Sequence, residues 1–287
     1  MYSRSFDYVR AESFAEACEL VRRYGDGAKI LAGGQSLLPM VNAGLVAPEV
    51  VVDISRIPEA RGVELDNGFL VVGALNTHHN LATNELMWST QPLVPAAAGH
   101  IGSGRIRNRG TLGGSLAHSD PAAELPLVMT ALNATYEVTN GQATREVKAE
   151  EFATSFMTTQ LDPDEIVISV RVPILGPGWG WSFSEVSRRR GDFAIVAAAA
   201  LVRSADGVVV EARLALGHVA DHPRRFVGVE AELSGATHDE IAARVGTIED
   251  IRPVSDTNAS GDHRRRLASV LAIRSLQEAF RRSEGNQ

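Results

Sequence analysis

Two glycine pairs, each followed by polar side chains, are the residues of this sequence best suited to bind a ligand. The first pair lies in KILAGGQSLLP, residues 29–39, and the second in RNRGTLGGSLAHSDPAAELP, residues 107–126. Backbone N–H groups in a glycine turn point into a concavity that suits phosphate oxygens. Side-chain donors follow both pairs: Gln35, Ser36, Thr111 and Ser115. The two segments indicate a pyrophosphate site, and two unrelated tight turns are the alternative.

The sequence lacks the common nucleotide-binding motifs. It contains no G-x-x-x-x-G-K-[ST] pattern, and in GSGRIRNRG the third glycine of G-x-G-x-x-G is replaced by Arg107. No G-x-S-x-G pattern is present either. A dinucleotide would therefore be held by a fold other than the Rossmann type.

The residue types give little evidence of a metal site or of a catalytic nucleophile. Pro223 opposes a helix that would align His218 with His222, and the other histidines form no ligand set. Cys18 is the only cysteine, which excludes internal disulfides and a cysteine-ligated iron–sulfur cluster on this chain. We expect Cys18 to be a small buried residue, and we assign no catalytic acid, base or nucleophile.

The overall composition is that of a globular protein. Of 287 residues, 44% are hydrophobic and 22% charged, and the net charge of −7 argues against a nucleic-acid binder. The apolar run FAIVAAAALV is too short for a membrane span. The first ten residues lack the apolar core of a signal peptide, so we expect a cytoplasmic protein.

Periodicity and turn residues predict mixed helices and strands before residue 175. A helix is expected over 14–24, because Ser13 and Glu16 form a capping-box pattern and Gly25 stops it. Asn67–Gly68 is expected to turn a hairpin. Further helices are expected at 78–84, after Pro92 or Pro95 and from 122, with strands at 28–32, 49–57, up to 140 and 163–174.

The segment LGPGWGW, residues 175–181, is the best candidate for a domain boundary, because four of its seven residues are glycine or proline. Two long strands are predicted around Asp206–Gly207, and helices near 238–246 and 262–283. Strands followed by helices indicate an α+β domain. The arginines of the last helix suggest either a partner-docking face or a helix packed on its own domain: Arg264, Arg265, Arg266 and Arg274.

Four motifs together resemble one known family. They are residues 29–57, residues 101–126, FMTTQLDPDEIVISVRVP at 156–173 and RRRGDFAIV at 188–196. They closely resemble the FAD-binding medium subunit of molybdenum-containing hydroxylases, a group that includes carbon monoxide, nicotine and xanthine dehydrogenases. The resemblance covers essentially the whole chain.

The family resemblance implies an α+β fold of two domains. Residues 1–176 would form an FAD-binding domain of the PCMH or vanillyl-alcohol-oxidase-like type, with subdomains of about 1–57 and 58–176. Residues 177–287 would form a C-terminal α+β domain of the CO dehydrogenase flavoprotein type.

The resemblance also implies which residues bind FAD. The first pyrophosphate loop would comprise Ala32, Gly33, Gly34, Gln35 and Ser36, with Leu37 following, and the second would comprise Thr111, Gly113, Gly114 and Ser115. Glu124 would accept hydrogen bonds from the adenosine portion, a role that Asp120 could take instead. Ile101 would contact the cofactor, the Leu161 backbone would lie near the flavin ring, and Asp192 and Phe193 would lie near the isoalloxazine.

Two residues depart from the carbon monoxide dehydrogenase pattern. This chain has Gln35 where that pattern reads AGGHS, and Phe193 where it has tyrosine. Both choices resemble the nicotine-type branch at least as well, which leaves the substrate of the complex open.

The function implied by the resemblance is electron transfer. A large molybdopterin-binding subunit and a small subunit with [2Fe–2S] clusters would be the partners, in a dimer of heterotrimers. Electrons would pass from those clusters to FAD on this chain and on to a quinone, NAD or oxygen. The alternatives are a stand-alone FAD-dependent oxidoreductase acting on a small organic substrate, and a nucleotide-sensing protein without redox activity.

Overall fold

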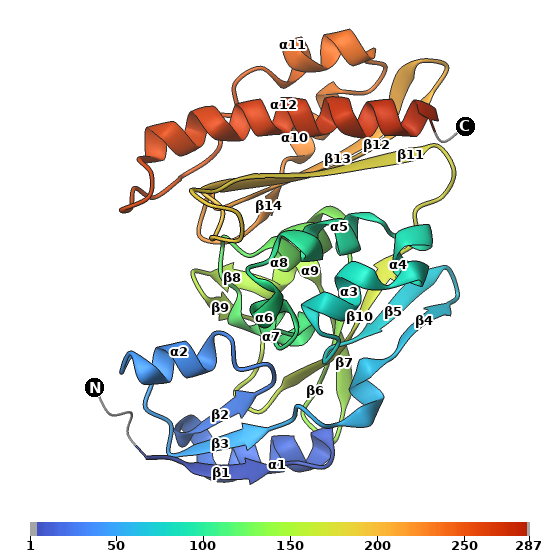
Figure 1. The fold of residues 1–287 in the computed structure, drawn as a ribbon. Coiled ribbons are helices and arrows are strands. Elements are labelled where there is room, and N and C mark those ends of the chain that lie inside the picture. The colour runs from blue at the N-terminus through green and yellow to red at the C-terminus, as the bar shows by residue number, and fades with distance from the viewer. Residues whose placement is uncertain (1–4, 286–287) are drawn as a thin grey trace.

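Three sheets of three or more strands follow one another along the molecule in the computed structural model, which describes residues 5–285 (Figure 1). The first sheet is parallel and has the order β1-β3-β2. Its strands are β1 (Asp7–Arg10), β2 (Ala28–Leu31) and β3 (Val50–Asp53), and it is accompanied by α1 (Phe14–Tyr24), η1 (Gly25–Gly27) and α2 (Leu37–Asn42).

The predicted first helix is confirmed in its limits and its cap. The Ser13 side chain accepts a hydrogen bond from the Glu16 N–H, and Gly25 follows the last residue with a positive φ. Cys18 lies on this helix and is fully buried, as expected.

The second sheet is antiparallel and has the order β4-β5-β10-β6-β7. Asn67 and Gly68 turn the predicted β4–β5 hairpin with positive φ. The strands are β4 (Val63–Asp66), β5 (Phe69–Gly73), β6 (Thr135–Thr139), β7 (Thr144–Lys148) and β10 (Ile166–Pro173).

Short helices cover this middle sheet and a small hairpin follows them. They are η2 (Pro58–Arg61), α3 (His78–Thr83), α4 (Glu85–Thr90), α5 (Leu93–His100), α6 (Gly104–Arg107), α7 (Leu112–His118), α8 (Glu124–Ala131) and α9 (Ala149–Phe152). The hairpin consists of β8 (Ala153–Ser155) and β9 (Thr158–Thr159). The expected helices at 78–84, after Pro92 and from 122 thus form. The sequence did not predict α2, α4, α6, α7, α9, β1, β7, β8 or β9.

The third sheet is antiparallel, with the order β11-β12-β13-β14. Its strands are β11 (Trp179–Val186), β12 (Val196–Ala205), β13 (Val208–Gly217) and β14 (Arg224–Arg225). The associated helices are α10 (Val227–Glu232), η3 (His238–Glu240), α11 (Ile241–Val245) and α12 (Gly261–Gly285). The two strands predicted around Asp206–Gly207 are β12 and β13, and β11 begins inside the segment expected to be a linker.

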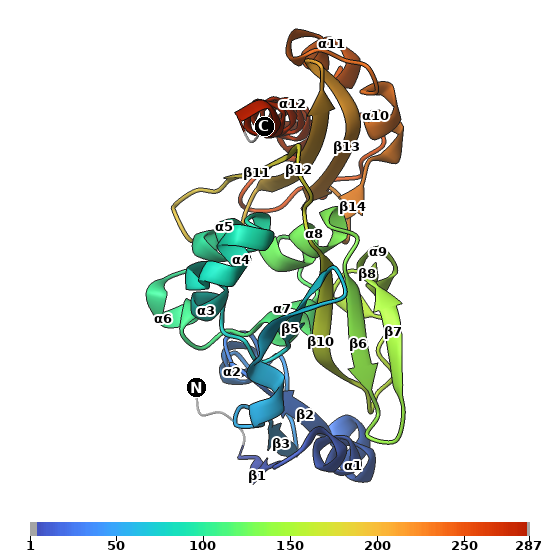
Figure 2. The same ribbon diagram turned by 90° about the vertical axis from the view of Figure 1, so that its right-hand side faces the viewer.

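The third sheet is buried on both faces. It lies between α12 on one side and α5 and α8 on the other (Figures 1 and 2). Along β12, Ala197 and Ala199 join the core of the middle layer, whereas Ala198 and Ala200 join the core under α12. The alanine run is therefore a strand whose alternate residues fill two cores.

The last helix packs on its own sheet. Arg264 is fully buried, and α12 lies against β11 and β12. This favours the second of the two interpretations of the arginine-rich segment. Among residues 5–285, no helix combines the length and hydropathy of a transmembrane span.

Candidate functional site

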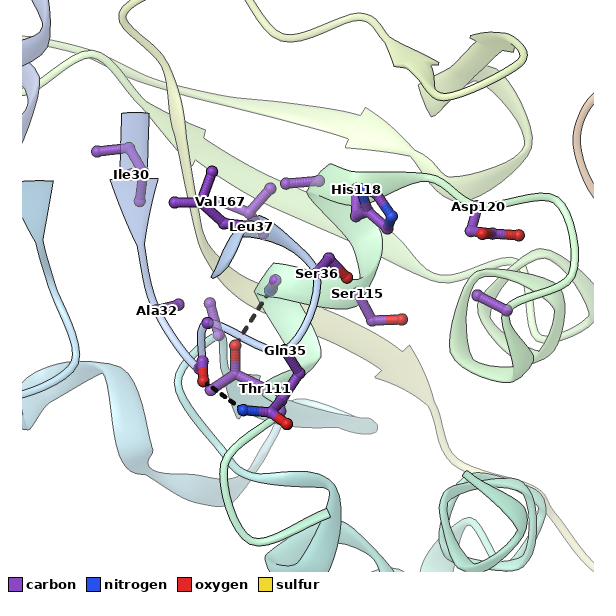
Figure 3. Close-up of a pocket in the computed structure, with 18 of the residues that line it drawn as sticks. Ile30, Ala32, Gln35, Ser36, Leu37, Thr111, Ser115, His118, Asp120 and Val167 are labelled. Carbon is purple, nitrogen blue, oxygen red and sulfur yellow. Dashed lines mark hydrogen bonds between the residues drawn. The ribbon is translucent and has the colours of Figure 1, made fainter. Parts of the chain in front are cut away.

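A cleft of about 700 Å³ is lined by both glycine loops. Figure 3 shows the side chains of the two loops together with His118 and Asp120. Of the predicted FAD-binding residues, these line the cleft: Ala32, Gly33, Gly34, Gln35, Ser36, Leu37, Ile101, Thr111, Gly113, Gly114, Ser115, Asp120, Glu124, Leu161 and Phe193. Asp192 is exposed and does not line it, although its neighbours Gly191 and Phe193 do. Residues from all three layers thus meet around one space.

The first loop offers unpaired backbone donors. It follows β2, and Gly34 adopts φ 72°, a conformation that favours glycine. The Gln35 Nε2 donates to the Gly33 carbonyl oxygen at 3.1 Å. None of the hydrogen bonds formed among residues 5–285 uses the N–H groups of Gly33, Gly34, Gln35 or Ser36. Such a run of free donors suits an anionic group.

The second loop uses its N–H groups within the protein. The N–H groups of Leu112 and Gly113 donate to the carbonyls of Asn76 and Ala74, and that of Gly114 to the Thr111 hydroxyl, which caps α7. This loop therefore presents hydroxyl groups, of which Ser115 lines the cleft. The first loop therefore presents backbone N–H groups and the second presents hydroxyl groups, whereas the sequence indicated backbone donors on both loops.

The glycines of the two loops also have a packing reason. A Cβ on Gly33 would lie 2.1 Å from the Arg109 carbonyl oxygen, and one on Gly113 would lie 2.7 Å from the Ala74 Cβ. The close approach that Gly33 permits is thus an approach of the second segment's backbone.

Glu124 brings a buried carboxyl to the cleft. It is only 5% exposed, and burial raises its pKa to about 7, with the Glu185 carboxylate adding to the effect. Asp120 accepts a hydrogen bond from the Ala122 N–H at 2.8 Å, so one of its oxygens holds the turn before α8. Of the two acidic residues, Asp120 therefore has one oxygen already engaged within the protein, which leaves Glu124 as the better candidate acceptor for a ligand.

The C-terminal part contributes Phe193, which is 63% exposed. Leu161 lines the cleft beside Met157, and the Leu161 N–H faces the Thr159 hydroxyl oxygen at 3.3 Å. The backbone group expected near the flavin ring thus already has a protein partner.

Sequence reasoning missed His78 as a residue of this site. Its Nε2 lies 3.0 Å from the Thr111 carbonyl oxygen, which fits a donating N–H, and burial lowers its pKa to about 4. A Cβ on Gly110 would lie 2.7 Å from the His78 ring. His78 is thus a neutral support of the second loop. No sequence signal indicates this, because the contact depends on the bridge between Thr77 and Thr111.

The fold and the cleft define an FAD-binding flavoprotein. Residues 4–175 match the model of the FAD binding domain in molybdopterin dehydrogenase, and residues 181–279 match the CO dehydrogenase flavoprotein C-terminal domain. The chain belongs to this family of molybdenum hydroxylase FAD subunits, which are components of oxidoreductases.

Individual relatives are similar over nearly their whole length. The subunit alpha of the 6-hydroxypseudooxynicotine dehydrogenase complex of Paenarthrobacter nicotinovorans is 36% identical, over 97% of this chain and 96% of its own. The glyceraldehyde dehydrogenase medium chain of Sulfolobus acidocaldarius is 35% identical, over 97% and 99%. The carbon monoxide dehydrogenase structure from Hydrogenophaga pseudoflava has a TM-score of 0.94 at 32% identity, over 98% of this chain and 99% of that chain.

Proposed function

We propose that this chain is the FAD-carrying electron-transfer subunit of a cytoplasmic molybdenum hydroxylase complex. It would accept electrons from the [2Fe–2S] clusters of a small subunit, beside a large molybdopterin-binding subunit, and pass them to a quinone, NAD or oxygen. The observation that supports FAD binding best is the run of free N–H groups from Gly33 to Ser36 on the wall of the cleft. Bound there, the isoalloxazine would supply the redox chemistry.

The residues present fit the cofactor. Free N–H donors of the first loop and the Ser115 hydroxyl would bind the pyrophosphate oxygens. Glu124 and Asp120 are acceptors suited to ribose hydroxyls or the adenine amine. Phe193 would cover part of the flavin, and we propose that Asp192 shapes that turn from outside the cleft. We also propose that the boundary between the FAD-binding domain and the C-terminal domain falls between residues 176 and 177.

The subunit role is favoured over a stand-alone oxidoreductase by the relatives that this chain matches over nearly their whole length. This chain covers 96–99% of the first two relatives, whose names describe a complex subunit and a medium chain.

Two exposed aromatic residues fit the docking of a partner: Phe193, which lines the cleft, and Phe156, which precedes the lining residue Met157. Phe193 and Phe156 are exposed by 63% and 61%. Within the described residues, Arg189 and Arg190 form no ion pair with an acidic side chain, and their loop touches the middle layer where Gly191 meets Gly102. Exposed aromatic residues with arginines are typical of interface centres, so we propose that partner chains dock here.

The test uses the purified chain and its absorption spectrum, followed by release and identification of the chromophore. Ser115→Ala should weaken FAD binding severalfold by removing one donor, whereas Ser89→Ala, a hydroxyl deletion in α4, should not change it. In the assembled complex, reduced small subunit should bleach the flavin.

Two results would contradict the proposal. Failure of the wild-type chain to bind added FAD, even with its partner subunits, would remove the cofactor assignment. Bleaching of the flavin by a small organic substrate in the absence of any partner would instead support the stand-alone oxidoreductase.

A further inference from the structure

A buried cation in the last helix reaches the segment that carries Phe193. Arg264 is 0% exposed, and burying a guanidinium is unfavourable unless its donors are paired. Its NH2 group donates to Asp256 Oδ2 at 2.6 Å. Its NH1 group donates to the carbonyl oxygen of Ile195, two residues after Phe193.

His218 holds the neighbouring carbonyl. Its Nδ1 lies 2.6 Å from the Ala194 carbonyl oxygen and 2.9 Å from Arg264 NH1. A guanidinium only donates and a carbonyl only accepts, so one ring nitrogen cannot bond both. The shorter contact fits an Nδ1–H that donates to Ala194. The N–H of His218 donates to the Pro121 carbonyl at 2.9 Å, which joins this residue to the acidic segment of the cleft.

The segment is also fixed on its other side. A Cβ on Gly191 would lie 2.7 Å from the Gly102 carbonyl oxygen, so the two backbones are in close contact. Phe193 itself, exposed by 63%, has little packing of its own. Its position at the cleft therefore depends on the backbone groups before and after it.

We propose that Arg264 and His218 are positioning residues, which hold the carbonyls of Ala194 and Ile195 and thereby fix Phe193 over the cleft. Where FAD is bound as proposed above, this arrangement sets how far small molecules reach the isoalloxazine. The first part concerns this chain alone, and only the second part rests on the proposed function.

Amide hydrogen exchange on the chain without FAD tests the first part. Ile195 donates its N–H to the Val186 carbonyl at 2.7 Å, so its exchange reports on this segment. In Arg264→Gln we expect exchange over residues 192–196 to be about tenfold faster, with residues 70–73 of β5 unchanged. Arg264→Lys should be intermediate. Arg266→Gln, an exposed neighbour on α12, should match the wild type.

Equal acceleration in residues 192–196 and 70–73 would show only a core-packing role and would overturn the proposal, as would no acceleration. If Arg264→Gln does not fold, His218→Leu decides, because it removes the donor to Ala194 and leaves the Arg264–Asp256 pair intact. Local acceleration in this variant supports the proposal, and its absence overturns it.

Quenching of flavin fluorescence by acrylamide tests the second part. With FAD still bound, Arg264→Gln should raise the quenching constant about twofold or more over Arg266→Gln, because Phe193 shields the ring less. Unchanged quenching would overturn the shielding role. A wild-type chain that binds no FAD would remove the proposed function, while the exchange result would still decide the positioning role.

Discussion

Gly33 lies against the backbone of Arg109, so closely that a Cβ on Gly33 would stand 2.1 Å from the Arg109 carbonyl oxygen. The first glycine loop follows a strand of the first sheet, and Arg109 belongs to the middle layer. The contact therefore joins two layers of the molecule at the cleft. A substitution there alters the scaffold of the site as well as its lining.

Gly33→Ala should lower the free energy of unfolding by about 1–3 kcal/mol and weaken FAD binding, because the two loops must separate to accommodate the methyl group. Urea unfolding and a titration with FAD measure the two effects. Gly62→Ala is the matched control, since a Cβ there meets nothing within 4 Å. A Gly33→Ala chain as stable as the control would contradict the contact.

Glu124 and His78 should give opposite dependences of stability on pH. In the folded chain the pKa of Glu124 is about 7 against an ordinary 4.5, so its contribution to stability falls as pH rises from 4.5 to 7. The pKa of His78 is about 4 against 6.5, so its contribution is lost as pH falls from 6.5 to 4. The two slopes nearly cancel in the wild type.

Glu124→Gln removes one of these slopes. We expect the variant to gain up to about 3 kcal/mol over the wild type at pH 8 and almost nothing at pH 4.5. Thermal or urea unfolding across this range measures the difference. Glu146→Gln, an exposed control, should follow the wild type. A gain that is the same at both pH values would show that Glu124 is not protonated in the folded chain.

Gly180→Ala should destabilise the C-terminal layer. A Cβ on Gly180 would lie 2.0 Å from the Ala279 carbonyl oxygen and 2.4 Å from the Ser283 nitrogen, both in α12. We expect a loss of about 3 kcal/mol or more in the free energy of unfolding. Gly176→Ala, four residues earlier with free space around it, should change stability little. Equal stabilities of the two variants would refute this packing.

Cys18 should be unreactive in the folded chain. Burial raises the pKa of its thiol to about 11, so the thiolate fraction at pH 8 is roughly a hundredfold below that of a thiol with the ordinary value of 9.0. A thiol assay with DTNB should show labelling only after denaturant is added. Immediate labelling of one thiol per native chain would be inconsistent with the buried position.

Local chemistry allowed most elements to be predicted. Ser13 caps the start of α1, Gly25 ends it, and the Asn67–Gly68 and Asp206–Gly207 pairs each form a turn. Each of these signals acts on residues only a few positions away from it. The strand β11 was missed, because glycine and proline suggested a linker. Gly180 instead allows close packing: the backbone of α12, which lies about a hundred residues later in the sequence, leaves no room for a Cβ at this position.

The site was predictable where a motif marks it and not where distant segments meet. The two glycine loops stood out by residue type, and both line the cleft. The role of Arg264 could not be read from an arginine run that is usually solvated, because its partners come from Ile195 and Asp256. His78 likewise depends on a bridge to Thr111.

The cleft draws on layers that come from successive parts of the chain. Gly33 follows β2 and Arg109 lies in the middle layer, β10 spans residues 166–173 at the centre of the middle sheet, and Arg264 lies in the last helix. A chain that ended before α12 would therefore lack the contact between Arg264 and the Ile195 carbonyl, and the segment that carries Phe193 would lose one of its supports.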